Sequence, residues 1–213
     1  MDAARIELGL NEVLHGDEIN RFDSIYKKGP SLFFCQEVIT RRKKYVDIKA
    51  YLNEEENIKY LYAALLAWDM NSRGAKMLDF IDFKGNIIDN IEKFVIMESI
   101  GDNIKEIDFD NVKSALGSIY DTLRVMKTKS KIVSNSKILH FLFPKILIPI
   151  DKTNTLKYLY KNNYESKKRY LEIIKYSFYF AKKDINWNGI LNNQEWNYSI
   201  PKIIDNSIIL CKK

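Results

Sequence analysis

Hydrophobic residues recur every three to four positions along most of the chain, the spacing of one face of an α-helix. The stretch 54–70 is apolar on nearly all sides, so we expect a central, buried helix there, with Asn53 as its N-cap. The same spacing predicts further helices over residues 3–14, 17–28, 31–52, 82–99, 108–126, 166–183 and 201–210, with shorter ones beginning near residues 137 and 151.

The composition agrees with a helical protein. Hydrophobic residues make up 46% and charged residues 29% of the 213 residues, as in folded globular chains. Eight glycines and four prolines are few for a protein of many short strands, and only residues 32–35 and 145–150 have strand-like composition. With no repeat or linker in the chain, we predict one compact all-α domain over residues 1–213, with about eight to ten helices.

The chain carries 34 Lys and Arg against 28 Asp and Glu, a net charge of +6. This balance permits contact with DNA or RNA without requiring it. Without a long apolar run or a secretory leader, we expect a cytoplasmic protein with no membrane contact. Cys35 and Cys211 have apolar neighbours, which favours buried thiols, and no metal-ligand spacing or cofactor motif is present. The sequence gives no indication of an oligomeric state.

Polar, capping and proline signals are densest in residues 133–160. Ser134 or Ser136 is expected to cap a helix that begins near Lys137, leaving free backbone amides at its start. Such an end could bind a phosphate, or it could be an ordinary capped helix with surface lysines. After Pro149, either Asp151 or Thr153 is expected to cap the following helix, and Asp151 could instead serve as a catalytic or ligand-binding carboxylate.

Other residues are candidates for binding. His140 lies on the same helical face as Lys137, and it is expected either to be a structural imidazole or to transfer protons. A basic cluster at residues 41–44 and a basic loop at residues 127–131 are read either as solvated surface or as phosphate contacts. Their candidate phosphate-binding residues are Arg41, Arg42, Lys129 and Lys131.

Two segments, residues 60–88 and 133–160, resemble an uncharacterised family of all-helical microbial proteins. The matching patterns are A-W-x-M-N-x-R-G-A and S-K-x-L-H-F-L-x-P-x-L-x-x-P-x-D. The resemblance covers about a quarter of the chain and implies no activity. The matching positions are Trp68, Asn71, Arg73, Gly74, Ser136, Lys137, His140, Pro144, Pro149 and Asp151.

Residues 133–151 also resemble, more distantly, the helix-hairpin-helix DNA glycosylases. In that family a glycine-rich hairpin and a lysine-bearing helix lead to an Asp at the start of the next helix. The resemblance places Lys137 and Asp151 in those two positions, although residues 133–137 lack the glycines and the interval between the two is short. It implies base extrusion, with Asp151 stabilising the sugar cation or activating water and Lys137 as an amine nucleophile.

Three functions therefore remain open. The first is a glycosylase-like DNA-binding protein with Lys137 and Asp151 as catalytic residues. The second is a non-catalytic module that binds nucleic acid through its basic residues. The third is a non-enzymatic module for a protein partner or a small ligand, in which Asn71, Arg73, His140 and Asp151 meet in one pocket.

Overall fold

The computed structural model describes residues 3–16, 18–26, 29–70, 76–192 and 195–211. Within these ranges the chain is all-α, as predicted, and the only β-type pairing is an isolated antiparallel bridge between Met77 and Met126. The elements are α1 (Ala3–His15), α2 (Phe22–Ile25), α3 (Pro30–Arg42), α4 (Ile48–Asn53), α5 (Glu55–Ala67), α6 (Phe80–Asp89), α7 (Ile91–Ser99), α8 (Phe109–Thr122), α9 (Ile132–Leu142), the π-helix η1 (Lys152–Leu156), α10 (Lys157–Tyr160), α11 (Lys167–Ala181), α12 (Trp187–Ile190) and α13 (Ile200–Leu210).

The thirteen α-helices of the described ranges exceed the eight to ten predicted. One reason is that single-turn helices form in connecting segments. Another is that two long predicted helices are broken. The predicted helix 31–52 is interrupted because Asp47 starts a new helix, its carboxylate accepting a hydrogen bond from the Ala50 amide at 2.7 Å. The predicted helix 82–99 is interrupted at the buried Asn90, between α6 and α7.

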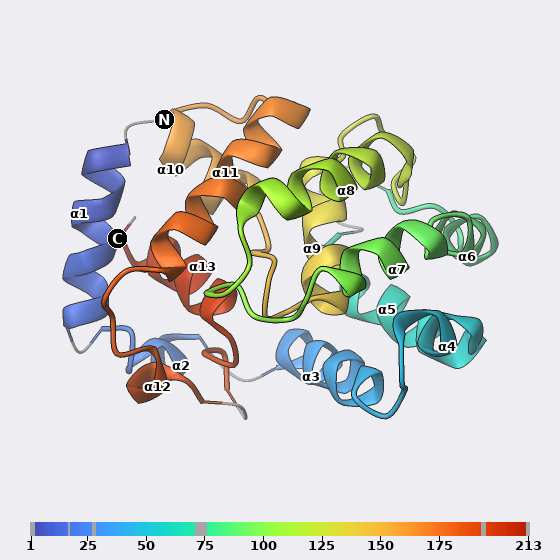
Figure 1. The fold of residues 1–213 in the computed structure, drawn as a ribbon, viewed down its shortest axis with the longest axis horizontal. Helices are drawn as coiled ribbons and strands as arrows, with labels where there is room; N and C mark the ends of the chain where they lie inside the picture. The colour runs from blue at the N-terminus through green and yellow to red at the C-terminus, as the bar shows by residue number, and fades with distance from the viewer. Residues whose placement is uncertain (1–2, 17, 27–28, 71–75, 193–194, 212–213) are drawn as a thin grey trace.

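The predicted central helix is also different. Helix α5 buries only one face, and Asn53, its expected cap, is instead the last residue of α4. The enclosed helix is α9, in which every residue except Val133 is buried. It lies in the interior with α3 and α5 packed against it (Figure 1). The serines and asparagine inside α9 are therefore core residues that must find hydrogen-bond partners.

The first and last helices of the chain pack against each other. Helix α1 packs against α13, which also contacts α11 and η1, so the described ends of the chain lie on the same side of the molecule (Figure 1). The buried hydrophobic side chains form one connected core from Ile6 to Leu210. No helix in the described ranges is long and apolar enough to cross a membrane. The arrangement brings α13 beside the segment that follows α9.

Candidate functional site

Helix α9 begins at Ile132, five residues earlier than predicted, and neither Ser134 nor Ser136 caps it. Its first amides are bound by Glu165, whose Oε2 accepts hydrogen bonds from the amides of Lys131 at 3.1 Å and Ile132 at 2.9 Å. The predicted phosphate site at the start of a helix near Lys137 is therefore wrong, because Lys137 lies within α9 and a carboxylate already occupies the helix start.

Ser136 fastens the segment after α9 to the helix. Its hydroxyl donates to the Val133 carbonyl oxygen at 3.1 Å and accepts from the Ile150 amide at 3.0 Å. Both Ser136 and Ile150 are buried. The hydroxyl thus satisfies a buried amide of an extended segment that has no strand partner, and it fixes where Asp151 emerges.

Asp151 caps η1, as one of its two predicted roles required. Its Oδ1 accepts hydrogen bonds from the amides of Thr153 at 2.8 Å and Asn154 at 2.7 Å. The Asp151 amide donates in turn to Thr155 Oγ1 at 3.0 Å. The carboxylate is half-buried, and all of its described hydrogen bonds fall on Oδ1. Capping therefore accounts for one oxygen of this carboxylate.

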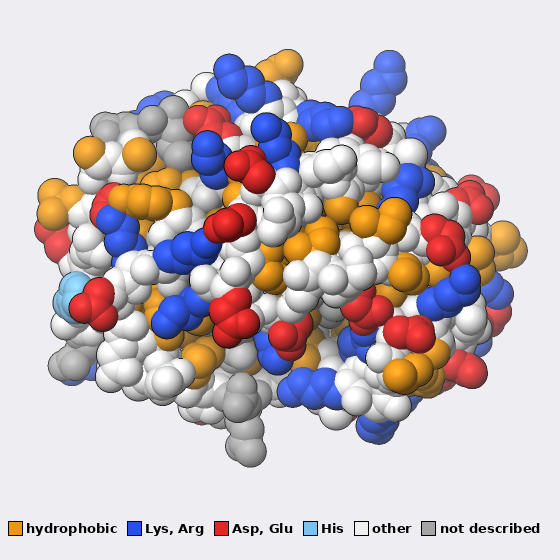
Figure 2. Space-filling view, in the orientation of Figure 1, with side chains coloured by type: hydrophobic (Ala, Val, Ile, Leu, Met, Phe, Trp, Pro, Cys, Tyr) orange, Lys and Arg blue, Asp and Glu red, His pale blue; other side chains and the backbone are white. Residues whose placement is uncertain are grey.

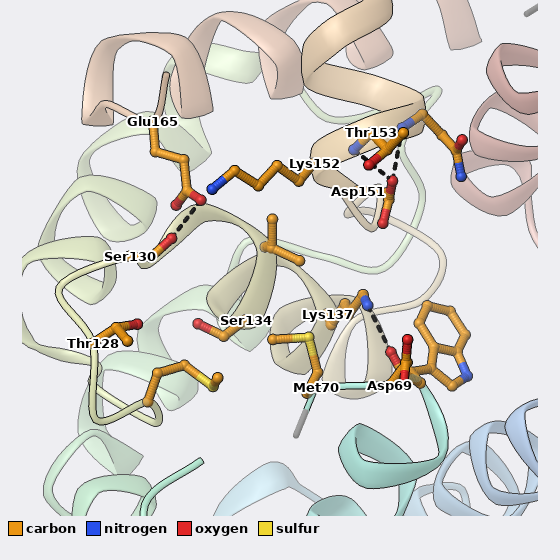
Figure 3. Close-up of a pocket in the computed structure, with 14 residues that line it drawn as sticks. Asp69, Met70, Thr128, Ser130, Ser134, Lys137, Asp151, Lys152, Thr153 and Glu165 are labelled. Carbon is orange, nitrogen blue, oxygen red and sulfur yellow. Dashed lines mark hydrogen bonds between the residues drawn. The ribbon is translucent and has the colours of Figure 1, made fainter. Parts of the chain in front are cut away.

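Two neighbouring cavities, of about 400 and about 570 Å³, adjoin at Asp151. Trp68, Asp69, Lys137, Asp151 and Asn154 line both of them. Figure 3 shows the first cavity, with the Lys137 amine on one side, directed toward the Trp68 carbonyl oxygen, and the Asp151 carboxylate on the other side. The first cavity has mixed walls, with polar side chains from Thr128, Ser130, Ser134, Lys152, Thr153 and Glu165 and apolar ones from Met70, Met126 and Val133. The second has apolar and aromatic walls, including Tyr26, Pro149, Ile150, Trp196 and Ile209.

Lys137 is the buried charge of this site, with 9% of its surface exposed. Its Nζ donates to the Trp68 carbonyl oxygen at 2.9 Å and lies 5.7 Å from the centroid of the Trp68 ring. Within the described ranges it forms no ion pair. Burial lowers the pKa of Lys137, and the nearby negative charges of Asp151 and Asp205 oppose that shift.

Asp69 ends α5 in a Schellman cap. Its φ of 64° lies in the left-handed region, which Asp tolerates better than most residues, and the amides of Asp69 and Met70 donate to the carbonyl oxygens of Leu66 at 3.0 Å and Leu65 at 3.2 Å. The turn follows Trp68, whose carbonyl oxygen accepts the bond from Lys137 and whose ring lines both cavities. This ordinary helix end places the Trp68 carbonyl oxygen beside the Lys137 amine.

A second pair of charged residues, Lys202 and Asp205, lines the larger cavity and was not predicted from the sequence. Lys202 Nζ is 2.6 Å from Asp205 Oδ2, and both side chains are almost fully buried. Burial raises the pKa of Asp205, and the Lys202 ammonium opposes that rise. The signal in the sequence is the spacing of three residues between a Lys and an Asp in an isoleucine-rich helix.

His140 is fully buried and lines neither cavity. Its Nδ1 donates to the Leu147 carbonyl oxygen at 2.6 Å, so its Nε2 must accept from the Tyr198 hydroxyl at 2.6 Å. The Cys35 thiol, 3.0 Å from the same hydroxyl oxygen, then donates to it. Burial lowers the pKa of His140 to about 3. These contacts are those of a structural imidazole.

Three of the four basic candidates already have partners within the protein. Arg41 pairs with Glu37 at 3.6 Å and stacks on the Tyr60 ring, and Arg42 pairs with Glu98. Lys131 Nζ donates to the carbonyl oxygens of Tyr120 at 3.1 Å and Asp121 at 2.8 Å, near the C-terminal end of α8. Lys129 is exposed. Asn71 and Arg73, the other candidates, lie outside the described residues.

The surface gives no sign of a single basic face in the view of Figure 2. Blue and red side chains alternate over this side of the molecule. The described residues also contain no group of three or more His, Cys, Asp or Glu suited to a metal ion. Of the predicted site residues, the structure thus brings Lys137 and Asp151 together, with Ser136 positioning the second.

No protein-family model matches this chain, and neither a curated protein nor a solved structure matches it. The function must therefore be argued from the site itself.

Proposed function

We propose that the protein binds a small polar ligand in the cavities at Lys137 and Asp151. The observation that carries the proposal is the Lys137 ammonium, which is buried, lines both cavities and has one described hydrogen-bond acceptor, the Trp68 carbonyl oxygen. An ammonium group has three donors, and leaving buried donors without acceptors costs free energy. A ligand oxygen in the cavity would supply an acceptor.

Asp151 provides a hydrogen-bond acceptor on the other side of the cavity. Because the described hydrogen bonds to its carboxylate use Oδ1, Oδ2 is available to accept from a hydroxyl or amino group of the ligand. The ligand class is therefore one that carries an acceptor oxygen and a donor group a few atoms apart, such as a hydroxy acid, a sugar or a nucleoside. The mixed polar and aromatic walls suit such a molecule.

The test uses acetate, D-ribose and uridine as probes, with binding followed by NMR at the amides of Thr153 and Asn154, which donate to Asp151. At least one probe should shift these amides, and Lys137→Met should abolish the shift. Lys145→Met is the matched control, because Lys145 is an exposed lysine that pairs with Asp102 away from the cavities. Unchanged binding by Lys137→Met, or no response to any probe, refutes the proposal.

Asp151→Asn separates the two roles of this residue. Asparagine caps helices about as well as aspartate, so the melting temperature should stay close to that of the wild type. Binding of the probe found above should weaken at least about tenfold if a charge-assisted hydrogen bond is lost. If Asp151→Asn binds the probe as tightly as the wild type does, then Asp151 only caps η1 and does not bind the ligand.

A glycosylase-like activity is the second candidate, and one observation favours it: Lys137 and Asp151 line one cavity, with Asp151 at the start of the following helix. In that mechanism the neutral Lys137 amine bonds to C1′ as the glycosidic bond breaks, the base leaves with the bonding electron pair and takes up the amine's proton, and the sugar ring opens to give a Schiff base. Since Glu165 occupies the start of α9, the phosphates would need other contacts.

Two measurements test this candidate and the non-catalytic nucleic-acid module together. Short single- and double-stranded DNA and RNA are titrated at low salt, where affinity from phosphate contacts is strongest. A uracil-containing oligonucleotide is then incubated with borohydride, which should trap a covalent adduct at Lys137. No binding at low salt excludes both nucleic-acid functions, and binding without an adduct or base release leaves only the non-catalytic module.

A further inference from the structure

The ion pair of Lys202 and Asp205 is buried, and removing its two charges from water costs free energy. Both residues lie on α13 and line the larger cavity, with only 5% and 6% of their side chains exposed. Removing two charges from water costs several kcal/mol for each ion, and a buried pair often stabilises a protein no better than apolar residues would. A contribution to stability therefore does not explain why α13 carries this buried ion pair.

The pair is linked to the Lys137 amine through Trp68. Lys202 Nζ lies 5.4 Å from the centroid of the Trp68 ring and 5.2 Å from that of Trp196. The Trp68 indole nitrogen donates to the Ser31 carbonyl oxygen at 2.7 Å, which fixes the other edge of the ring. The backbone oxygen of the same Trp68 accepts the hydrogen bond from Lys137.

We infer that Lys202 and Asp205 are positioning residues that hold Trp68, and through its carbonyl oxygen the Lys137 ammonium, in place for a ligand, and that their opposite charges act on the proton which this ammonium presents to the ligand. The inference rests on the proposed function, because it assigns the regulation of the same cavity. Lys202 repels the proton on the Lys137 amine and Asp205 attracts it, so the two members of the pair act in opposite senses.

Four charged groups face Lys137 from the elements packed around it. Asp69 follows α5, Asp151 caps η1, and Lys202 and Asp205 lie on α13. Burial lowers the pKa of Lys137 and Lys202 lowers it further, whereas the three carboxylates raise it. Changing one member of the buried pair should therefore move the titration of Lys137 in a direction that depends on the member changed.

The experiment is competitive labelling of the full chain with trace acetic anhydride across a pH series, with the label on each lysine quantified by mass spectrometry. Only the neutral amine reacts, so the midpoint reports its proton affinity. In Lys202→Gln the midpoint of Lys137 should rise by about one pH unit, and in Asp205→Asn it should fall by about one. Both replacements keep a donor at position 202 and an acceptor at position 205, which favours folding of each variant.

A double variant, Lys202→Met with Asp205→Leu, covers the case in which a single variant unfolds, since apolar replacement of a whole buried pair is often tolerated. It should change the near-ultraviolet circular dichroism of the tryptophans, because Lys202 no longer lies over Trp68 and Trp196. Lys152, an exposed lysine of the smaller cavity, is the internal control, and its uptake of label should be the same in every variant.

The outcomes are distinguishable. Midpoints that are unchanged, or that move in the same direction in both single variants, overturn the inference, as does a double variant with the wild-type tryptophan spectrum. If Lys137 of the wild-type protein takes up no label at any pH, the cavity does not admit a small molecule and the proposed function itself fails.

Discussion

Glu165 caps α9 at Ile132, its carboxylate accepting a 2.9 Å hydrogen bond from the backbone amide. The same oxygen binds the Lys131 amide, and the Ser130 hydroxyl donates to the other oxygen. Replacing Glu165 by Ala should lower the free energy of unfolding by about 1–2 kcal/mol, because two helix-start amides lose their acceptor. Urea unfolding measures this difference.

The control for Glu165 is Glu92→Ala. Glu92 is an exposed carboxylate that pairs with Lys49 on the surface, where an ion pair adds little to stability. The free energy of unfolding of Glu92→Ala should fall by less than about 1 kcal/mol, since Glu92 contributes only its surface ion pair and its place in the first turn of α7. If Glu165→Ala and Glu92→Ala lost equal free energies of unfolding, the cap by Glu165 would not stabilise α9 more than a surface ion pair does.

His140 predicts a dependence of stability on pH. The pKa of His140 is lowered to about 3 by burial, whereas an unfolded chain binds this proton near pH 6.5. Between these values the unfolded state holds more protons, so stability should be level above pH 6.5 and should fall as the pH drops toward 3. The slope contributed by this one proton is up to about 1.4 kcal/mol per pH unit.

The measurement is urea unfolding between pH 7 and pH 5, compared for the wild type and His140→Gln. The variant has no titrating group at this position and should lose that part of the slope. His15→Gln, at an exposed position at the end of α1, should keep it. A slope that survives in His140→Gln would contradict the assignment.

Arg42 and Lys129 should differ sharply although both were candidates for phosphate contact. Arg42 pairs with Glu98 and donates to the Tyr45 carbonyl oxygen at 3.2 Å, and Glu98 also accepts from the Ile48 amide at 2.9 Å. Arg42→Gln should therefore cost about 1.5–3 kcal/mol of unfolding free energy. Lys129→Gln, at an exposed site, should change it by less than about 0.5 kcal/mol. Similar losses in thermal or urea unfolding would refute this distinction.

Ser136→Ala should destabilise the protein without altering the chemistry of the cavity. The buried Ile150 amide would lose its acceptor, at a cost of about 1–3 kcal/mol. Ser24→Ala removes an exposed hydrogen bond to the Arg21 carbonyl oxygen and should have little effect. If Ser136→Ala were as stable as the wild type but failed to bind the probes, Ser136 would be a ligand contact instead.

Patterns of short range were enough to predict several features of this protein. Helical spacing of apolar residues and the scarcity of Gly and Pro predicted the all-α class. The first helix was placed correctly to within one residue, because its amphipathic pattern is strong. The capping of η1 by Asp151 also followed from local sequence, since an Asp bonds to amides only two and three residues away.

The breaks in the long helices and the start of α9 were not predicted, because each depends on a partner distant in sequence or on a competing cap. The start of α9 is fixed by Glu165, 33 residues away. Ser136 looks like a cap in sequence, yet it lies inside a helix whose burial comes from its neighbours α3 and α5. Tertiary packing thus overrode the local signal.

The sequence by itself determined that the chain forms helices, and it singled out Lys137 and Asp151 as the residues to test. Only the tertiary structure decided that these two share a cavity, that His140 is enclosed away from it, and that α13 brings Lys202 and Asp205 beside Trp68. The physical reason is that helical pattern is local, within a few residues. The environment of a buried charge is set by segments such as α5, α9, η1 and α13, which meet only when the core forms.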